Sequence, residues 1–194
     1  MCMRCKRPEQ GFTLIEVMIS IVVLAVGMLA LLGSIGFALA NTQSAQLDLV
    51  AKQLAQQAME SIYTARDTAN VTWCQLQNPG PSCPAPAVPA TGIFQTGFQP
   101  IDLAGADGII GTSDDSGAQT LVSPGPDGIV GTSDDLVNHL DGYSRSIVFG
   151  TNDPETGVTL PANLRVVTIT IRYTTPQFKV PKNYVLTGYI SQYR

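Results

Sequence analysis

Residues 11–40 of the chain are almost continuously apolar. From Val17 to Ala40 there are 24 residues and none of them is charged. As a helix this run would be about 36 Å long, at about 1.5 Å per residue, against a bilayer hydrocarbon core of about 30 Å. We therefore expect residues 12–40 to form a hydrophobic helix that can cross a membrane.

Beyond Ala40 the apolar positions become periodic. They recur every three or four residues, which predicts an amphipathic helix over residues 41–68. No proline occurs between Phe12 and Arg66, so the two segments should form one continuous helix. The expected apolar face of the second segment carries Leu47, Val50, Ala51, Leu54, Ala58, Ile62 and Ala65.

The C-terminal quarter alternates between apolar and polar positions, as half-buried strands do. Candidate strands cover residues 143–149, 165–173 and 184–190. The second is the clearest, because its apolar residues fall on alternate positions. Those residues, expected on one face, are Val167, Ile169, Ile171 and Tyr173.

Turn-forming residues separate these candidate strands. Residues 152–157 have the sequence NDPETG, and Pro176 and Pro181 mark a second turn. An antiparallel sheet over residues 143–194 would need a cover for its apolar face, and the helix of residues 41–68 is the candidate. The pattern predicts an α+β fold, a long N-terminal helix packed by its second half on a C-terminal antiparallel sheet.

Charge is arranged asymmetrically around the apolar run. Arg4, Lys6 and Arg7 precede it against the single acid Glu9, so the positive-inside rule places this end in the cytoplasm. A cleaved secretory signal and a plain uncleaved anchor are the alternatives. Secretory signals have an apolar region of about 7–15 residues, however, which is shorter than this one.

Residues 11–17, GFTLIEV, resemble the prepilin motif of the type IV pilin superfamily. Gly11, Phe12 and Glu16 fall on the three defining positions of that motif. The resemblance implies that residues 1–11 are a leader peptide. It also implies that a prepilin peptidase cuts between Gly11 and Phe12 and methylates the new N-terminus.

Residues 17–20 and 24–29 look most like minor pilins of the PilV kind. The resemblance implies a pilin-like fold and a minor pilin that assembles into, primes or caps a type IV pilus. Its partners would be other minor and major pilins, prepilin peptidase and the inner-membrane assembly platform. The precursor would lie in the inner membrane with a cytoplasmic leader and a periplasmic head, and the mature chain would reach the pilus at the cell surface. The alternatives are a type II secretion pseudopilin and a surface adhesin anchored by a pilin helix.

Glu16 is the lone carboxylate at the start of the apolar run, and such a group is presumptively functional. Cleavage after Gly11 would free an ammonium on Phe12, four residues away. The family resemblance implies that Glu16 of an incoming subunit neutralises the N-terminus of its neighbour and so sets the register of assembly. The alternative is that Glu16 only extends to the lipid headgroups.

The four cysteines form two groups. Cys2 and Cys5 lie in the leader and would be removed with it. Cys74 and Cys83 lie on the exported side, where an oxidising compartment favours a disulfide. Closing so short a loop would stabilise the fold by about 2–3 kcal/mol.

Residues 69–142 read as a variable loop region that contains an internal duplication. Residues 105–115, GADGIIGTSDD, recur at residues 125–135 as GPDGIVGTSDD, with nine of eleven positions identical. From Asp102 to Asp141 there are eight aspartates and no lysine or arginine, so something should offset their repulsion.

Two interpretations of the duplication stay open. Calcium binds six to eight oxygen ligands, and each repeat offers carboxylates between turn-forming glycines. The other interpretation is two solvated β-hairpins, because Asp-Gly is itself a strong turn signal. The candidate calcium ligands are Asp107, Asp114, Asp115, Asp127, Asp134 and Asp135.

Composition argues against two further classes of function. The formal net charge is −4, and removal of the basic leader makes it about −6, so no basic surface for nucleic acid is expected. His139 is the single histidine, and no nucleophile, general base or cofactor motif accompanies it. We expect a protein that is not an enzyme and that requires no cofactor.

Overall fold

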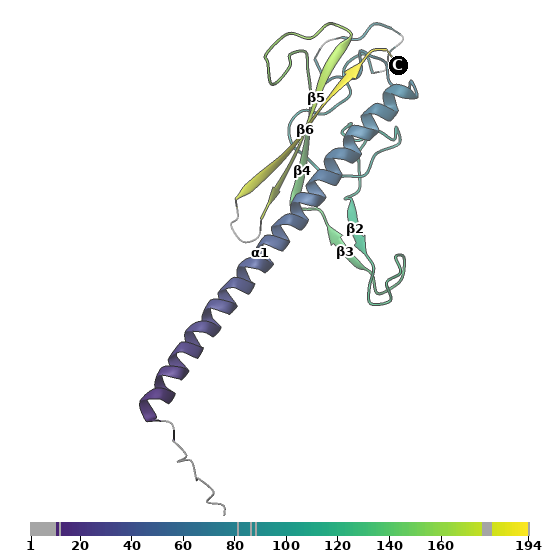
Figure 1. The fold of residues 1–194 in the computed structure, drawn as a ribbon. Coiled ribbons are helices and arrows are strands. Elements are labelled where there is room, and N and C mark those ends of the chain that lie inside the picture. Colours follow the sequence, from purple (N-terminus) through teal and green to yellow (C-terminus); the bar gives the residue numbers. More distant parts are fainter. Residues whose placement is uncertain are drawn as a thin grey trace, which may run out of the picture. The chain divides into compact units, whose positions relative to one another are not determined.

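The computed structural model describes residues 11, 13–80, 82–85, 87, 89–175 and 180–193. These residues contain one long helix and six strands (Figure 1). The elements are α1 (Leu14–Asp67), β1 (Gln99–Pro100), β2 (Thr120–Ser123), β3 (Leu136–His139), β4 (Tyr143–Gly150), β5 (Leu164–Thr174) and β6 (Pro181–Ser191). The chain divides into two compact units, Met1–Ser44 and Ala45–Arg194, and the second is called the head below.

The helix α1 is continuous over 54 residues, as the lack of proline predicted. In the head its apolar face is buried at Ala51, Leu54, Ala58 and Ile62, which confirms the predicted stripe. Leu47 and Val50, also predicted on this face, are partly buried and pack against the same core. The predicted amphipathic segment is therefore a core helix of the head.

The main sheet is antiparallel, with strand order β1-β4-β5-β6. Its centre is β5, which pairs with β4 from Tyr143↔Tyr173 to Gly150↔Val166 and with β6 from Leu164↔Ser191 to Thr174↔Pro181. The predicted apolar face of β5 is confirmed, because Val167, Ile169, Ile171 and Tyr173 are all buried. These side chains join the buried face of α1 in one hydrophobic core, so the fold is α+β and pilin-like.

Gly188 of β6 lies against side chains of α1. A Cβ atom added there would lie 2.9 Å from Met59 Cε and 3.0 Å from the Tyr63 hydroxyl oxygen, both on α1. That hydroxyl donates a hydrogen bond to the carbonyl of Tyr189 at 3.0 Å. A side chain at this point of the sheet would have to displace the ends of the Met59 and Tyr63 side chains, and glycine avoids that contact.

The sheet differs from the prediction at two points. It includes β1, which sequence analysis left in the loop region, because a two-residue strand has no alternation to detect. Pro181, expected in a turn, is instead the first residue of β6, a position where a proline costs no ladder hydrogen bond. Pro176, the other proline of that predicted turn, lies outside the described residues.

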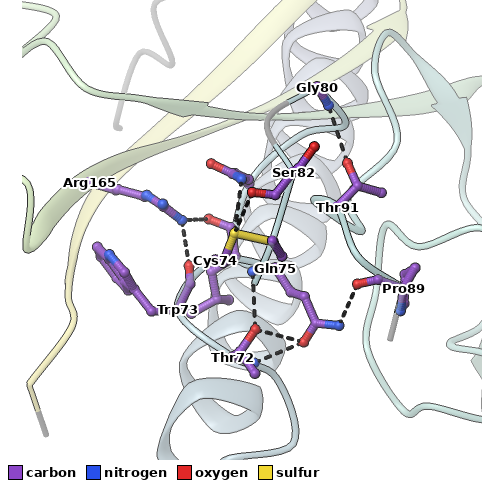
Figure 2. Close-up of a disulfide and its surroundings, with 12 residues drawn as sticks. Thr72, Trp73, Cys74, Gln75, Gly80, Ser82, Pro89, Thr91 and Arg165 are labelled. Carbon is purple, nitrogen blue, oxygen red and sulfur yellow. Dashed lines mark hydrogen bonds between the residues drawn. A yellow bond between two sulfur atoms is a disulfide. The ribbon is translucent and has the colours of Figure 1, made fainter. Parts of the chain in front are cut away.

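The segment after α1 is closed on itself by the predicted disulfide and is fastened to the sheet by Arg165. Cys74 and Cys83 are bonded, which confirms the pairing (Figure 2). Arg165 of β5 lies over the Trp73 ring and donates from Nη1 to the carbonyls of Trp73 and Leu76, at 2.6 and 2.7 Å. Partial burial lowers the pKa of Arg165, but these acceptors hold its charge in place.

Asn78 links the same segment to the edge of the sheet. Its Nδ2 donates to the carbonyls of Phe94 and Ile147, at 3.1 and 2.8 Å. Its Oδ1 accepts from the backbone N–H of Phe149 at 2.9 Å. One side chain thus satisfies backbone groups of β4 that no strand pairs, and it fixes the segment that carries Phe94 into the core.

Candidate functional sites: the start of the helix and the duplicated loops

The predicted assembly residue Glu16 lies in the first turn of α1. The backbone N–H of Glu16 donates to the carbonyl and to the hydroxyl of Thr13, at 3.1 and 3.4 Å. Thr13 is therefore the N-cap of the helix, and Glu16 follows it by three residues as in a capping box. A carboxylate in this turn also faces the positive end of the helix dipole.

The described residues of the N-terminal unit form no buried core. Every aliphatic side chain from Leu14 to Leu39 is exposed, and Leu14 is exposed by 81% and Leu29 by 70%. Among the described residues, α1 is the one helix that is long and apolar enough to cross a membrane. Such a surface needs lipid or other protein to cover it.

The structure describes only part of the predicted processing site. Gly11 is exposed, and a Cβ atom added there would meet nothing within 4 Å, so packing does not explain its glycine. Phe12, the predicted methylated residue, lies outside the described residues. The rest of the leader, with Cys2 and Cys5, lies outside them too.

The two repeats are loops that fold alike: the second joins β2 to β3, and the first is closed by an isolated antiparallel bridge between Asp102 and Ala118. In the first repeat the N–H groups of Ile109 and Gly111 donate to Asp107 and Asp115, at 2.8 and 2.7 Å. In the second repeat the equivalent donors, Ile129 and Gly131, make the same hydrogen bonds within the loop to Asp127 and Asp135, at 2.8 and 2.6 Å. The loops are closed by backbone N–H groups that turn inward to the carboxylates.

Hydroxyl groups complete this pattern. Thr112 and Thr132 donate to Asp114 and Asp134, at 2.7 and 2.6 Å. These hydroxyls are the largest cause of the lowered pKa of both carboxyls. Hydrogen bonds within each loop therefore offset part of the repulsion among the aspartates.

The first repeat also has a cation from the sheet. Arg145 of β4 is buried, with its Nη2 3.6 Å from Asp115 Oδ2. Burial lowers the pKa of Arg145 and raises the pKa of Asp115, because each charged form is partly desolvated. No salt bridge joins the second repeat to a described residue.

The predicted calcium ligands are thus gathered in two loops rather than in one cluster. Among the described residues, no group of three or more His, Cys, Asp and Glu side chains is arranged to hold a metal ion. Calcium binding stays a prediction. His139 lies exposed on β3, opposite Thr120.

Sequence analysis missed three residues that position these sites. Thr13 could have been found from its spacing to Glu16, which is the capping-box signature before an apolar run. Asn78 and Arg145 had no comparable signal, because their partners are 71 and 30 positions away in the chain. Such contacts follow from the tertiary fold.

Comparison with known proteins identifies the N-terminal segment. Residues 6–32 match the family model of the prokaryotic N-terminal methylation motif. No curated protein and no solved structure matches the chain significantly. The match supports a type IV pilin-like protein, of a pilus or a pseudopilus, and it suggests a structural protein.

The motif also defines the processing and the location of the chain at a general level. It implies cleavage by prepilin peptidase and assembly with other pilins. Together with the long apolar helix α1, it fits a precursor anchored in the inner membrane.

Proposed function

We propose that the chain is a minor pilin of the PilV kind, cut between Gly11 and Phe12, that assembles into, primes or caps a type IV pilus. One observation carries the proposal. The residues that match the methylation motif include the first turn of α1, where Glu16 is the one carboxylate of the exposed apolar segment from Leu14 to Ala40. Residues 17–20 and 24–29 support the PilV kind by their resemblance.

Glu16 would act through charge pairing between subunits. When apolar helices bundle, water is excluded and an unpaired carboxylate becomes costly. The nearest cation that processing creates is the ammonium of Phe12, on the same chain or on a neighbour. Pairing with a neighbour would hold adjacent helices at one axial offset. The head would then lie outside the bundle, in contact with other minor and major pilins.

The test replaces Glu16 with glutamine, which keeps the shape and removes the charge. Glu16→Gln should be cleaved normally but should be depleted from sheared filaments about tenfold or more, since losing one partner of a desolvated ion pair costs several kcal/mol. The measurement is an immunoblot of membrane and filament fractions. Ser20→Ala is the matched control, because Ser20 is on the next turn and only donates to the Glu16 carbonyl, at 2.7 Å.

Normal incorporation of Glu16→Gln would contradict the pairing mechanism. A second experiment, deletion of the gene, separates a pilus protein from a pseudopilus protein. Deletion of the gene should reduce surface pili and leave type II secretion intact. Loss of secretion with normal piliation would instead identify a pseudopilin.

A further inference from the structure

The two repeats have the same internal structure but opposite surroundings. In the first repeat Ile109 and Ile110 are 2% and 5% exposed, whereas the equivalent Ile129 and Val130 of the second are 60% and 62% exposed. The glycines between the matched hydrogen bonds adopt the same backbone, with φ of 97° at Gly111 and 98° at Gly131. The difference is therefore one of partners and not of loop conformation.

The first repeat shows how such a loop is covered. Its Ile110 N–H donates to the Ser61 hydroxyl on α1 at 3.0 Å. A Cβ atom added to Gly111 would lie 2.5 Å from Ile147 Cδ1, so this loop lies directly on β4. Arg145, on the same strand, supplies the cation for Asp115. The cover consists of a helix with a hydroxyl side chain and a strand with an aliphatic and an arginine side chain.

The second repeat has none of these partners among the described residues. A Cβ atom added to Gly131 would meet nothing within 4 Å. No described cation forms a salt bridge with the Asp135 carboxylate. The hairpin that carries the loop is anchored in the core only at its base, through Leu121 and Leu140.

The strands of this hairpin add to the exposed apolar surface. Val122, Leu136 and Val137 are exposed by 44%, 64% and 53%. The hairpin forms its own two-stranded sheet, β2-β3, separate from the main sheet (Figure 1). An isolated two-stranded sheet is marginally stable in water, so a covering partner would stabilise it.

We propose that the loop of residues 125–135 is a docking site for a protein partner that presents a helix beside a strand, with an arginine on that strand. The arginine would pair with Asp135 as Arg145 pairs with Asp115. Ile129 and Val130 would be buried as Ile109 and Ile110 are. The loop is already closed by its own hydrogen bonds, so docking would cost little conformational entropy.

The partner is another protein and not a second copy of this chain. In a second copy the corresponding surface, formed by Ser61, Ile147 and Arg145, is occupied by that copy's own first repeat. Binding there would require the first repeat to leave, which would expose Ile109 and Ile110. The acidic character of the loop and the missing cation together favour a basic partner surface.

Site-specific photocrosslinking in the source cells tests the proposal on the full chain. A benzophenone amino acid is placed at Val130, and a control is placed at Val158, which is also 62% exposed but lies on the β4–β5 loop. We expect an adduct at position 130 several times stronger than at 158. Mass spectrometry should map it to a helix or an adjacent strand of another protein, beside an arginine.

Asp135→Asn, made in the Val130 crosslinking chain, tests the ion pair. Asparagine still accepts the hydrogen bond from Gly131 but has no charge, so the loop should stay closed while the adduct falls about tenfold. Asp141→Asn, outside the repeat, is the charge-matched control and should leave the adduct unchanged. An adduct to a second copy of the chain, equal adducts at 130 and 158, or an adduct insensitive to Asp135→Asn would each overturn the proposal.

The crosslinking result is independent of the proposed function. The adduct is measured in whole cells, before filaments are isolated. A chain with Glu16→Gln that is absent from filaments but still forms the adduct would support docking without assembly. A chain that enters filaments but forms no adduct would refute docking alone.

Discussion

At the scale of single residues, Ala69 has the least favourable backbone conformation for its residue type in the described chain. It is the one described non-glycine residue with a positive φ, 56°. It ends α1 in a Schellman-type cap, in which the N–H of Asn70 donates to the Ala65 carbonyl at 3.0 Å and that of Ala69 donates to the Arg66 carbonyl at 3.1 Å. Such caps usually have glycine here, because a side chain in the left-handed region is strained.

Ala69→Gly should therefore stabilise the chain. The left-handed conformation costs an alanine about 1–2 kcal/mol, of which the extra flexibility of glycine in the unfolded chain offsets part, so the expected gain is about 0.5–1 kcal/mol. The measurement is urea unfolding of the full chain in detergent. Gln56→Gly, on the exposed face of α1, is the control and should destabilise by about 1 kcal/mol. Equal destabilisation by both changes would show that Ala69 is unstrained.

Asp153 controls the acid stability of the turn between β4 and β5. The Tyr189 hydroxyl donates to Asp153 Oδ2 at 2.5 Å, and this bond is the main reason that the pKa of Asp153 is lowered to about 2. The N–H groups of Glu155 and Thr156 donate to Oδ1, at 2.9 and 2.8 Å. A lowered pKa means that the ionised carboxyl stabilises the folded state.

This stabilisation should be complete above the unfolded pKa of about 4. It should be lost as the pH falls through about 2. Wild type should therefore exceed Asp153→Asn in urea midpoint at pH 5, and the difference should shrink steadily toward pH 2. Tyr189→Phe should move the loss to higher pH, because it removes the largest cause of the lowered pKa. A difference between wild type and Asp153→Asn that does not change with pH would contradict this assignment.

At the scale of elements, periodicity was sufficient where an element was long. It predicted α1, β4, β5 and β6 to within a few residues, because each has a regular apolar face against one core. It missed β1, β2 and β3, which have two to four residues; β1 pairs with the distant strand β4, and β2 and β3 pair with each other across the second repeat. Short strands have no pattern of their own, so only the fold reveals them.

The duplicated loops show a second limit of sequence reasoning. Sequence analysis left calcium loops and two hairpins open as alternatives; the structure has one two-stranded hairpin, β2-β3, around the second repeat and an isolated bridge around the first. The sequence could not indicate that residues 105–115 would be covered and residues 125–135 exposed. That difference depends on how each loop is placed in the tertiary fold, which local sequence does not determine.

The calcium hypothesis also belongs to these loops. If they bind calcium, millimolar calcium should raise the thermal midpoint of the full chain in detergent, since a ligand that binds only the folded state stabilises it. Magnesium should act less, because it requires a smaller octahedral site. A thermal midpoint that does not change with calcium would contradict the calcium hypothesis. The loops would then be closed only by their own hydrogen bonds, such as those of Thr112 and Thr132.

At the scale of the whole molecule, the chain combines two units with different requirements. The head buries its own core between α1 and the sheet. The N-terminal unit leaves its aliphatic surface exposed and contains all of the residues that match the methylation motif. The sequence revealed this division early, because an uncharged apolar run and an acidic, loop-rich remainder are distinguishable by composition alone.

The proposed role depends on the leader being removed at one bond. Cleavage after Gly11 removes three cations and exposes the ammonium that Glu16 would pair with. Cleavage elsewhere would leave Glu16 without that partner at the required spacing. A chain that kept its leader would be a simple membrane anchor.

The most direct test is the mass of the N-terminal peptide of the mature chain, taken from membranes and from sheared filaments. We predict a peptide that begins at Phe12 and carries one N-terminal methyl group. Cells without prepilin peptidase should give only the unprocessed chain. A mature chain that begins at Met1, after Ala40 or at any other residue would contradict the account.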